Sequence, residues 1–136
     1  MRGNKPTWVK FGLDLLQFDE VQELAHVLCV SRVEAAGYIA LAVAMGMSMA
    51  DDDGIIDHLS DKAIEDACGW EGMRGELINA FLKAGVFDGE RDSDTNPMYI
   101  ARSLWIEMAG DAIKKRTDSR KRQANKRAKD RANRQS

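Results

Sequence analysis

The chain has 136 residues, of which 44% are hydrophobic and 31% are charged. This length allows one packed domain of about 100 residues with an appendage, and it is too short for two separate cores. Residues 1–110 hold 9 Lys/Arg against 19 Asp/Glu, a net charge of −10, whereas residues 111–136 hold 11 against 3, a net charge of +8. The overall charge of −2 therefore conceals an acidic body and a basic tail, and the tail predicts a polyanionic partner.

The cysteine content and the hydropathy of the chain indicate its cellular compartment. Cys29 and Cys68 both fall in apolar helical patterns, and two free thiols in a small chain indicate a reducing compartment rather than a disulfide framework. The first residues lead into no unbroken apolar run, so no signal peptide is expected. The longest apolar stretch, residues 38–47, is too short to cross a bilayer. We therefore expect a cytoplasmic protein that makes no membrane contact.

The first predicted elements are an extended segment and two helices. Residues 8–13 alternate large apolar residues with others, which indicates a short extended lead-in. Apolar residues at helical spacing then predict a helix over about residues 19–29. Ser31 followed by Glu34 has the spacing of a capping box, and it begins a second helix that runs towards Met49.

A turn and a third helix follow. Three aspartates and Gly54 end the second helix, and residues 55–56 have the composition of a short strand. Either Ser60 or Asp61 caps the third helix, and Gly69 ends it. Its expected buried residues are Ala63, Ile64 and Ala67.

The last elements of the acidic body are a fourth helix and a hairpin. The fourth helix is predicted over residues 73–84, and Gly85 ends it. Residues 86–87, a polar loop over 88–97 and residues 99–100 are typical of a β-hairpin. The expected buried face of the fourth helix consists of Met73, Leu77, Ile78, Phe81 and Leu82.

This element order, with a short strand, a helix–turn–helix and a hairpin, is that of a winged helix. We therefore predict a mainly α-helical fold, with a winged helix-turn-helix domain over residues 1–103 and a small β-hairpin as its wing. Residues 104–136 form a basic tail that is either a long helix or disordered. Its Ala, Lys, Arg and Gln content and three acid-before-base pairs at i,i+4 favour a helix, whereas its charge of +8 opposes one.

Seven segments carry a family resemblance, and none is diagnostic alone. They are WVK at 8–10, DEVQEL at 19–24, VSRVEA at 30–35, DG at 53–54, LSD at 59–61, ACGWEG at 67–72 and LKAGVF at 82–87. In this order, over roughly residues 8–105, they resemble the N-terminal winged-helix domain of phage and prophage replisome-organiser proteins, the DnaD-like replication initiators.

This resemblance implies binding to origin DNA in a bacterial host cell, help in loading the replicative helicase, and oligomerisation through the winged-helix domain. Proteins of that family usually continue past the basic stretch into a linker and a further domain that contacts the helicase machinery. We therefore expect the printed sequence to be either a fragment or a shortened relative.

In a winged helix, the helix after the tight turn normally enters the major groove of DNA. With its apolar residues inward, the predicted helix 73–84 turns Glu76, Asn79 and Lys83 outward. Asn79 has the groups to read adenine, and Lys83 has the charge to bind a phosphate or guanine. The alternative is that these residues form an ordinary solvated face.

The basic tail is a second candidate for contact with double-stranded DNA. Each Lys or Arg placed on a phosphate releases condensed counterions, whatever the base sequence. The tail has no aromatic residue beyond Trp105, so stacking on single-stranded bases is not indicated. The alternative is a solvated charged helix. The candidate residues, spread around the predicted helix, are Lys114, Lys115, Arg116, Arg120, Lys121, Arg122, Lys126, Arg127, Lys129, Arg131 and Arg134.

No metal site, cofactor or active site is predicted. His26, Cys29, His58 and Cys68 lack the paired spacing of structural zinc sites, so packing roles are expected for them. The aspartate run at 51–53 lacks the alternating ligands of a calcium loop. The sequence also contains no phosphate-binding glycine loop and no recognisable nucleophile turn, so we expect a protein that is not an enzyme.

These patterns together predict a DNA-binding protein of phage or prophage replication initiation, in which the tail supplies most of the affinity. Its expected partners are double-stranded DNA, helicase or helicase-loading proteins, and further copies of itself. One alternative is an adaptor that docks a replication or transcription protein through its acidic domain. Another is that the basic tail folds back on the acidic domain until DNA competes for it.

Overall fold

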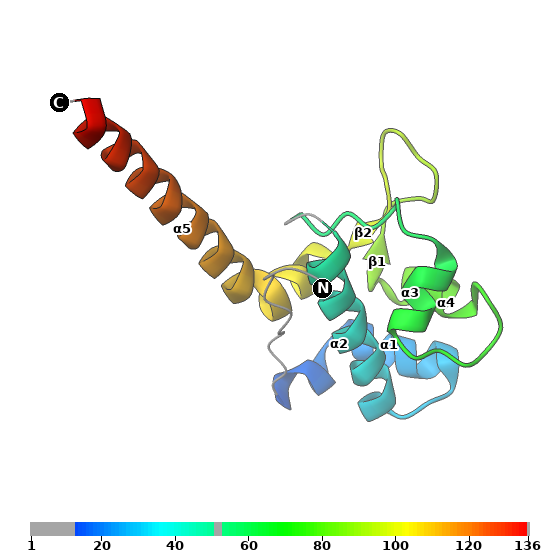
Figure 1. Ribbon diagram of the computed structural model, residues 1–136. Helices are drawn as coiled ribbons and strands as arrows, with labels where there is room; N and C mark the ends of the chain where they lie inside the picture. Colours follow the sequence, from blue (N-terminus) through cyan, green and yellow to red (C-terminus); the bar gives the residue numbers. More distant parts are fainter. Residues whose placement is uncertain (1–12, 51–52, 136) are drawn as a thin grey trace.

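The computed structural model describes residues 13–50 and 53–135, and it is mainly helical with one small antiparallel sheet (Figure 1). A 3-10 helix, η1 (Leu13–Gln17), precedes four helices: α1 (Asp19–Leu28), α2 (Arg32–Met49), α3 (Asp61–Ala67) and α4 (Glu76–Ala84). The strands β1 (Phe87–Asp88) and β2 (Tyr99–Ile100) form a hairpin, and α5 (Arg102–Gln135) follows it. The predicted extended lead-in over 8–13 lies outside the described residues, apart from Leu13, which begins η1.

α1 and α2 form a pair that is bent by 110°. Cys29 ends α1 in the left-handed conformation, with φ at 56°. Ser31 then caps α2, because its Oγ accepts a hydrogen bond from the backbone N–H of Glu34 at 3.1 Å, which confirms the predicted N-cap. Among the described helices, none is by itself long and apolar enough to span a membrane, and only this bent pair reaches that length and composition.

α2 lies at the centre of the fold and packs against η1, α1, α3 and α5. Its side chains at Ile39, Val43 and Met47 are fully buried. At Gly46, a Cβ atom would lie 2.5 Å from Cδ1 of Ile100 and 3.1 Å from the ring of Trp105. The missing side chain at Gly46 therefore lets the hairpin and the start of α5 approach the α2 backbone.

The sheet consists of the β1–β2 hairpin and one additional bridge. β1 and β2 are antiparallel, as predicted for the hairpin. On the other side of β2, Ile55 forms an antiparallel bridge with Tyr99, and the N–H of Ile56 donates to the carbonyl of Met98 at 3.0 Å. The short strand expected at 55–56 is therefore a single bridge, and β2 lies between it and β1.

α5 is one continuous helix with two different halves. In the first half Leu104, Met108 and Ala112 are fully or almost fully buried against the rest of the protein. Every side chain from residue 119 to residue 133 is exposed, and Figure 1 shows this half projecting from the body. At a rise of 1.5 Å per residue, residues 119–135 extend for about 25 Å. The described part of the basic tail is thus helical, and the expected boundary at 103/104 falls inside α5.

One boundary prediction and two burial predictions were wrong. α4 begins at Glu76 rather than at residue 73, and Met73 is 77% exposed instead of buried. The reason is Gly75, whose φ of 89° lies in the left-handed region and interrupts the helical path. In α3, Ala67 is exposed, and the residue buried beside Ile64 is instead the charged Glu65.

The burial within α5 predicts the shortest chain that folds. A chain that ends at residue 118 keeps every buried side chain of α5 and should unfold in urea at the same midpoint as the full chain. A chain that ends at residue 103 loses Leu104, Trp105 and Met108, each worth about 2–5 kcal/mol. That loss is comparable with the whole stability of a small domain, about 5–15 kcal/mol. Far-UV circular dichroism against urea measures both, and cooperative unfolding of the 1–103 chain at the full-length midpoint would contradict the assignment.

Candidate nucleic-acid interface

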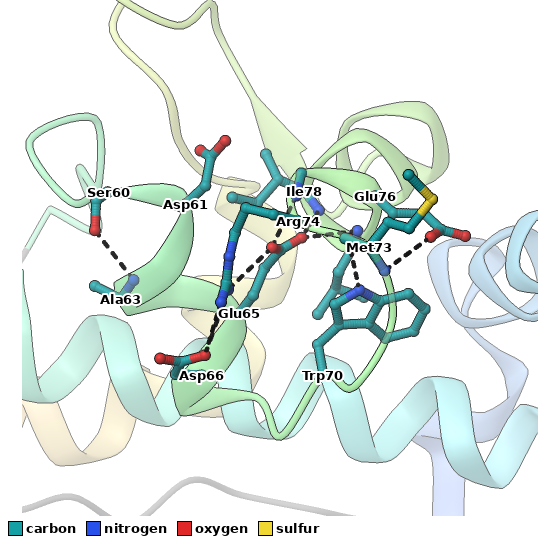
Figure 2. A network of polar contacts seen from close by, with 12 residues as sticks. Ser60, Asp61, Ala63, Glu65, Asp66, Trp70, Met73, Arg74, Glu76 and Ile78 are labelled. Carbon is teal, nitrogen blue, oxygen red and sulfur yellow. Dashed lines mark hydrogen bonds and ion pairs between the residues drawn. The ribbon is translucent and has the colours of Figure 1, made fainter.

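α3 and α4 are held together by one buried carboxylate (Figure 2). Glu65 on α3 is 0% exposed. Its Oε1 accepts a hydrogen bond from the N–H of Gly75 at 2.8 Å, and its Oε2 accepts from Leu77 at 2.9 Å and from Ile78 at 3.4 Å. These N–H groups lie at the start of α4, where a helix offers them no partner of its own. Glu65 therefore caps α4 from the neighbouring helix, with its negative charge at the positive end of the helix dipole.

Arg74 completes this network on the solvent side. Its Nη1 lies 3.3 Å from Oε1 of Glu65, and its Nη2 lies 3.3 Å from Oδ1 of Asp66. The Arg74 side chain is 48% exposed, so water screens both ion pairs and each contributes little stability by itself. The hydrogen bonds from the α4 backbone to Glu65 are therefore the main link between the two helices.

The turn between α3 and α4 is fixed by two further hydrogen bonds (Figure 2). The indole Nε1 of Trp70 donates to the carbonyl of Met73 at 3.1 Å. The N–H of Met73 donates to Oε2 of Glu76 at 3.3 Å. The backbone of the turn is thus held from both ends although the Met73 side chain faces solvent.

Sequence reasoning did not single out Glu65. The buried residues that the helical pattern predicts here are Ala63, Ile64 and Ala67, and Glu65 is not among them. A signal was nevertheless present, because Glu65 sits beside Ile64 and three residues before Cys68, and both of these are buried. A buried carboxylate requires donors from elsewhere in the fold, and the glycine before α4 supplies one.

The predicted outward positions of α4 are confirmed as exposed. Glu76, Asn79 and Lys83 follow one another at spacings of three and four residues, so they share one helical face. This face carries one acid, one amide and one base, and it has no net charge. It therefore offers phosphates a single cation, Lys83.

The hairpin loop presents negative charge. Its one base, Arg91, pairs with the carboxylates of Asp61 and Asp57, and the N–H of Asp92 donates to Oδ1 of Asp57 at 3.2 Å. These contacts tie the loop to the segment that precedes α3. The remaining charged side chains of the loop are exposed acids: Asp88, Glu90, Asp92 and Asp94. The hairpin is therefore poorly suited to contact phosphates.

Most basic candidates of the tail are exposed on α5. Arg116 differs from the others, since it is only 7% exposed and its Nη2 donates to the carbonyl of Met47 at 2.7 Å. That carbonyl lies in the last turn of α2, where carbonyls lack helical partners, so the structure places Arg116 in a packing contact. Arg134 belongs to α5, and its side chain is outside the described ones. The exposed candidates are Lys114, Lys115, Arg120, Lys121, Arg122, Lys126, Arg127, Lys129 and Arg131.

The cysteines and histidines do not gather. Within residues 13–50 and 53–135, no three or more His, Cys, Asp or Glu side chains come together in a way that could hold a metal ion. Cys29, His26 and His58 are exposed, so the packing roles expected for them are wrong. Cys68 is buried as expected, and its burial, with a smaller effect of the Glu65 charge, raises the pKa of its thiol to about 12.

Removal of the Glu65 side chain should cause a large loss of stability, because Glu65 caps α4. In Glu65→Ala the buried N–H groups of Leu77 and Ile78 lose their acceptor, and each unsatisfied donor costs about 1–3 kcal/mol. We expect the free energy of unfolding in urea to fall by about 3 kcal/mol. The control is Asp66→Ala, which also removes a partner of Arg74 but from the exposed side, and should cost less than about 1 kcal/mol. Equal effects of the two substitutions would refute the cap.

Thiol labelling gives an independent check of the α3 packing. Cys29 should react with a thiol reagent in the native protein, whereas Cys68 should react only when the chain unfolds. Because the Cys68 pKa rises from 9.0 to about 12 on folding, the free energy of unfolding should also fall as pH rises between these values. Cys29→Ser should leave no fast-reacting thiol, and rapid labelling of that variant would contradict the burial of Cys68.

Comparisons with protein-family models, with curated proteins and with solved structures found no match. The resemblance to replisome organisers therefore depends on the seven segments alone.

Proposed function

We propose that this chain is a non-enzymatic protein that binds double-stranded DNA mainly through the projecting half of α5. The observation that carries the proposal is the charge of this half, where residues 119–133 are all exposed and hold seven Lys/Arg against one Asp. A rod of this charge density gains free energy from counterion release when it lies on phosphates. It lacks apolar residues other than three alanines, so a protein core is an unfavourable environment for it.

We propose further that the body is a winged helix. In support, α2, the bridge at Ile55, α3, α4 and the β1–β2 hairpin follow the helix, strand, helix, turn, helix and hairpin order of that fold. α4 then corresponds to the helix that enters the groove, and its exposed Asn79 and Lys83 would be the groups that meet DNA. The Glu65 cap would set the angle at which α4 approaches the duplex.

Within this proposal the body contributes little affinity. α4 offers phosphates one exposed cation, and the hairpin carries exposed acids while its only base is paired internally. Like charges repel the DNA backbone, so the body would be held near DNA by α5 rather than by its own contacts. These separate roles of α5 and the body explain why an acidic body is joined to a basic helix.

We assign the biological role to the initiation of phage or prophage DNA replication in the bacterial cytoplasm. This assignment is supported by the seven segments that resemble replisome organisers. Helicase or helicase-loading proteins and further copies of the chain are the protein partners that it implies. No cofactor is part of the proposal.

The salt dependence of binding tests the role of α5 in the full-length chain. The variant changes Arg120, Arg122, Lys126, Arg127, Lys129 and Arg131 to Gln, which keeps good helix formers at all positions. Loss of six phosphate contacts should reduce the slope of log K against log salt by about 5. Fluorescence anisotropy with a labelled duplex measures this slope. Lys83→Gln is the comparison on α4, and it should reduce the slope by about 1.

An unchanged slope in the six-residue variant would show that α5 does not carry the binding. That result would favour the second candidate function, in which the chain is an adaptor that docks a basic replication or transcription protein through its acidic surface. The acidic hairpin favours this alternative, because Arg91 and Asp57 hold it in place and leave its other carboxylates exposed. An adaptor would show weak DNA binding near physiological salt and a stable complex with a protein partner.

A further inference from the structure

Six of the seven basic side chains at residues 119–133 of α5 form two rows. Because α5 is a continuous helix, positions three, four, seven or eleven residues apart lie near one face. One row consists of Arg122, Lys126 and Lys129, and the other consists of Arg120, Arg127 and Arg131. We call these the two basic rows.

The two basic rows are separated by two different faces. On one side lie Ala124, Ala128 and Ala132, which follow one another at i, i+4 and i+8, together with Lys121, which is three residues before Ala124 and seven before Ala128. On the opposite side lie Ser119, Gln123 and Asp130. All the residues of both faces are exposed. The projecting half thus has an alanine face, which also carries Lys121 and is flanked by the two basic rows, and behind it a polar face with the only acid among residues 119–133.

This arrangement matches the shape and charge of the DNA major groove. The groove is about 12 Å wide and has a phosphate strand along each wall, and a helix with its side chains is about 10–12 Å across. Alanines towards the floor let the helix axis approach the base edges, and Lys121 on the same face has the charge to contact guanine. Cations on both flanks then reach both walls, and the polar face with Asp130 is turned to solvent.

We propose that the projecting half of α5 binds in the major groove of double-stranded DNA as an intact helix, with its alanine face towards the bases and one basic row towards each phosphate strand. The proposal rests on the proposed function and adds how the duplex is held. A segment of about 25 Å along the groove covers on the order of seven base pairs at 3.4 Å per pair. The length of this half also keeps most of the acidic body away from the phosphates.

Other polyanions fit these features less well. A membrane-surface helix needs a bulky apolar face, whereas the alanine face here holds three alanines and Lys121. The major groove of A-form RNA is too deep and narrow to admit protein side chains to its bases. Single-stranded nucleic acid is held largely by aromatic stacking, and residues 119–133 contain no aromatic side chain.

The test is a pair of full-length double variants that leave every charge unchanged. Ala124→Leu with Ala128→Leu places bulk on the alanine face, and Ser119→Leu with Gln123→Leu places similar bulk on the polar face. Leu keeps the helix in both variants, which circular dichroism verifies. The dissociation constant is measured by anisotropy for a DNA duplex and for an RNA duplex of the same sequence, and the salt slope is measured for the DNA.

The alanine-face variant should bind the DNA duplex about tenfold more weakly, a change of about 1.4 kcal/mol. The polar-face variant should stay within about twofold of the parent, which is about 0.4 kcal/mol. The parent protein should prefer DNA to RNA. It should also protect guanine N7, an atom of the major groove, from methylation.

Three results would overturn the groove placement while leaving DNA binding intact: equal affinity of the two double variants, equal affinity of the parent for DNA and RNA, or unprotected guanine N7. Absence of duplex binding by the parent would instead overturn the proposed function itself. The two failures are therefore distinguishable in one set of measurements.

Discussion

α5 leaves the body in a defined direction because its first half is packed against α2. Trp105 lies over Gly46, where the absence of a side chain brings the two helices close, and Leu104 and Met108 are buried beside it. Further along, Arg116 donates to the carbonyl of Met47 in the last turn of α2. A helix anchored in this way over four turns transmits its orientation to the residues that follow, since a continuous helix is stiff over this length. The position of the basic rows relative to the body is therefore a consequence of the α2–α5 contact.

The body itself depends on a buried negative charge, in contrast to the exposed positive charges of α5. Glu65 places a carboxylate under the first turn of α4, and its hydrogen bonds with Gly75, Leu77 and Ile78 replace the water that its burial removes. Arg91 uses its guanidinium to tie the hairpin to the residues before α3. Two of the bases near the proposed DNA side thus serve the structure of the body, Arg91 in the hairpin and Arg74 beside Glu65. The DNA binding proposed above therefore depends on a separate basic element, which α5 supplies.

Every side chain from residue 119 to residue 133 in the projecting half of α5 is exposed. Its helix is supported by the propensity of Ala, Lys, Arg and Gln and by initiation from the packed first half, which removes the cost of nucleation. Repulsion among seven exposed cations acts against it. Phosphates on either side would relieve that repulsion, so helix stability and DNA binding would strengthen each other in the proposed complex. The alternative in which the tail folds back on its own body would require α5 to break, whereas the structure has one uninterrupted helix.

Local sequence was sufficient for most of the elements. Ser31 caps α2 as its spacing predicts, and of the two candidates for α3 it is Ser60 that caps the helix. Gly85 ends α4, and the polar run after Phe87 forms a hairpin loop. These features depend on contacts between residues a few positions apart, which the sequence displays directly. The division into an acidic body and a basic tail, and the exposure of Asn79 and Lys83, were likewise visible in composition and periodicity.

The tertiary structure decided what depends on distant partners. Arg116 and Arg120 are four residues apart and chemically alike, yet only Arg116 meets the end of α2 and becomes buried. Glu65 is buried because Gly75, Leu77 and Ile78 surround it with donors, and Met73 is exposed because Gly75 delays the start of α4. The two basic rows also emerge only once α5 is known to be unbroken, because positions far apart share a face only along a continuous helix. Sequence alone thus determined which residues carry charge. The fold determined which of those charges are exposed to a partner, because burial and hydrogen bonding depend on contacts that sequence spacing does not reveal.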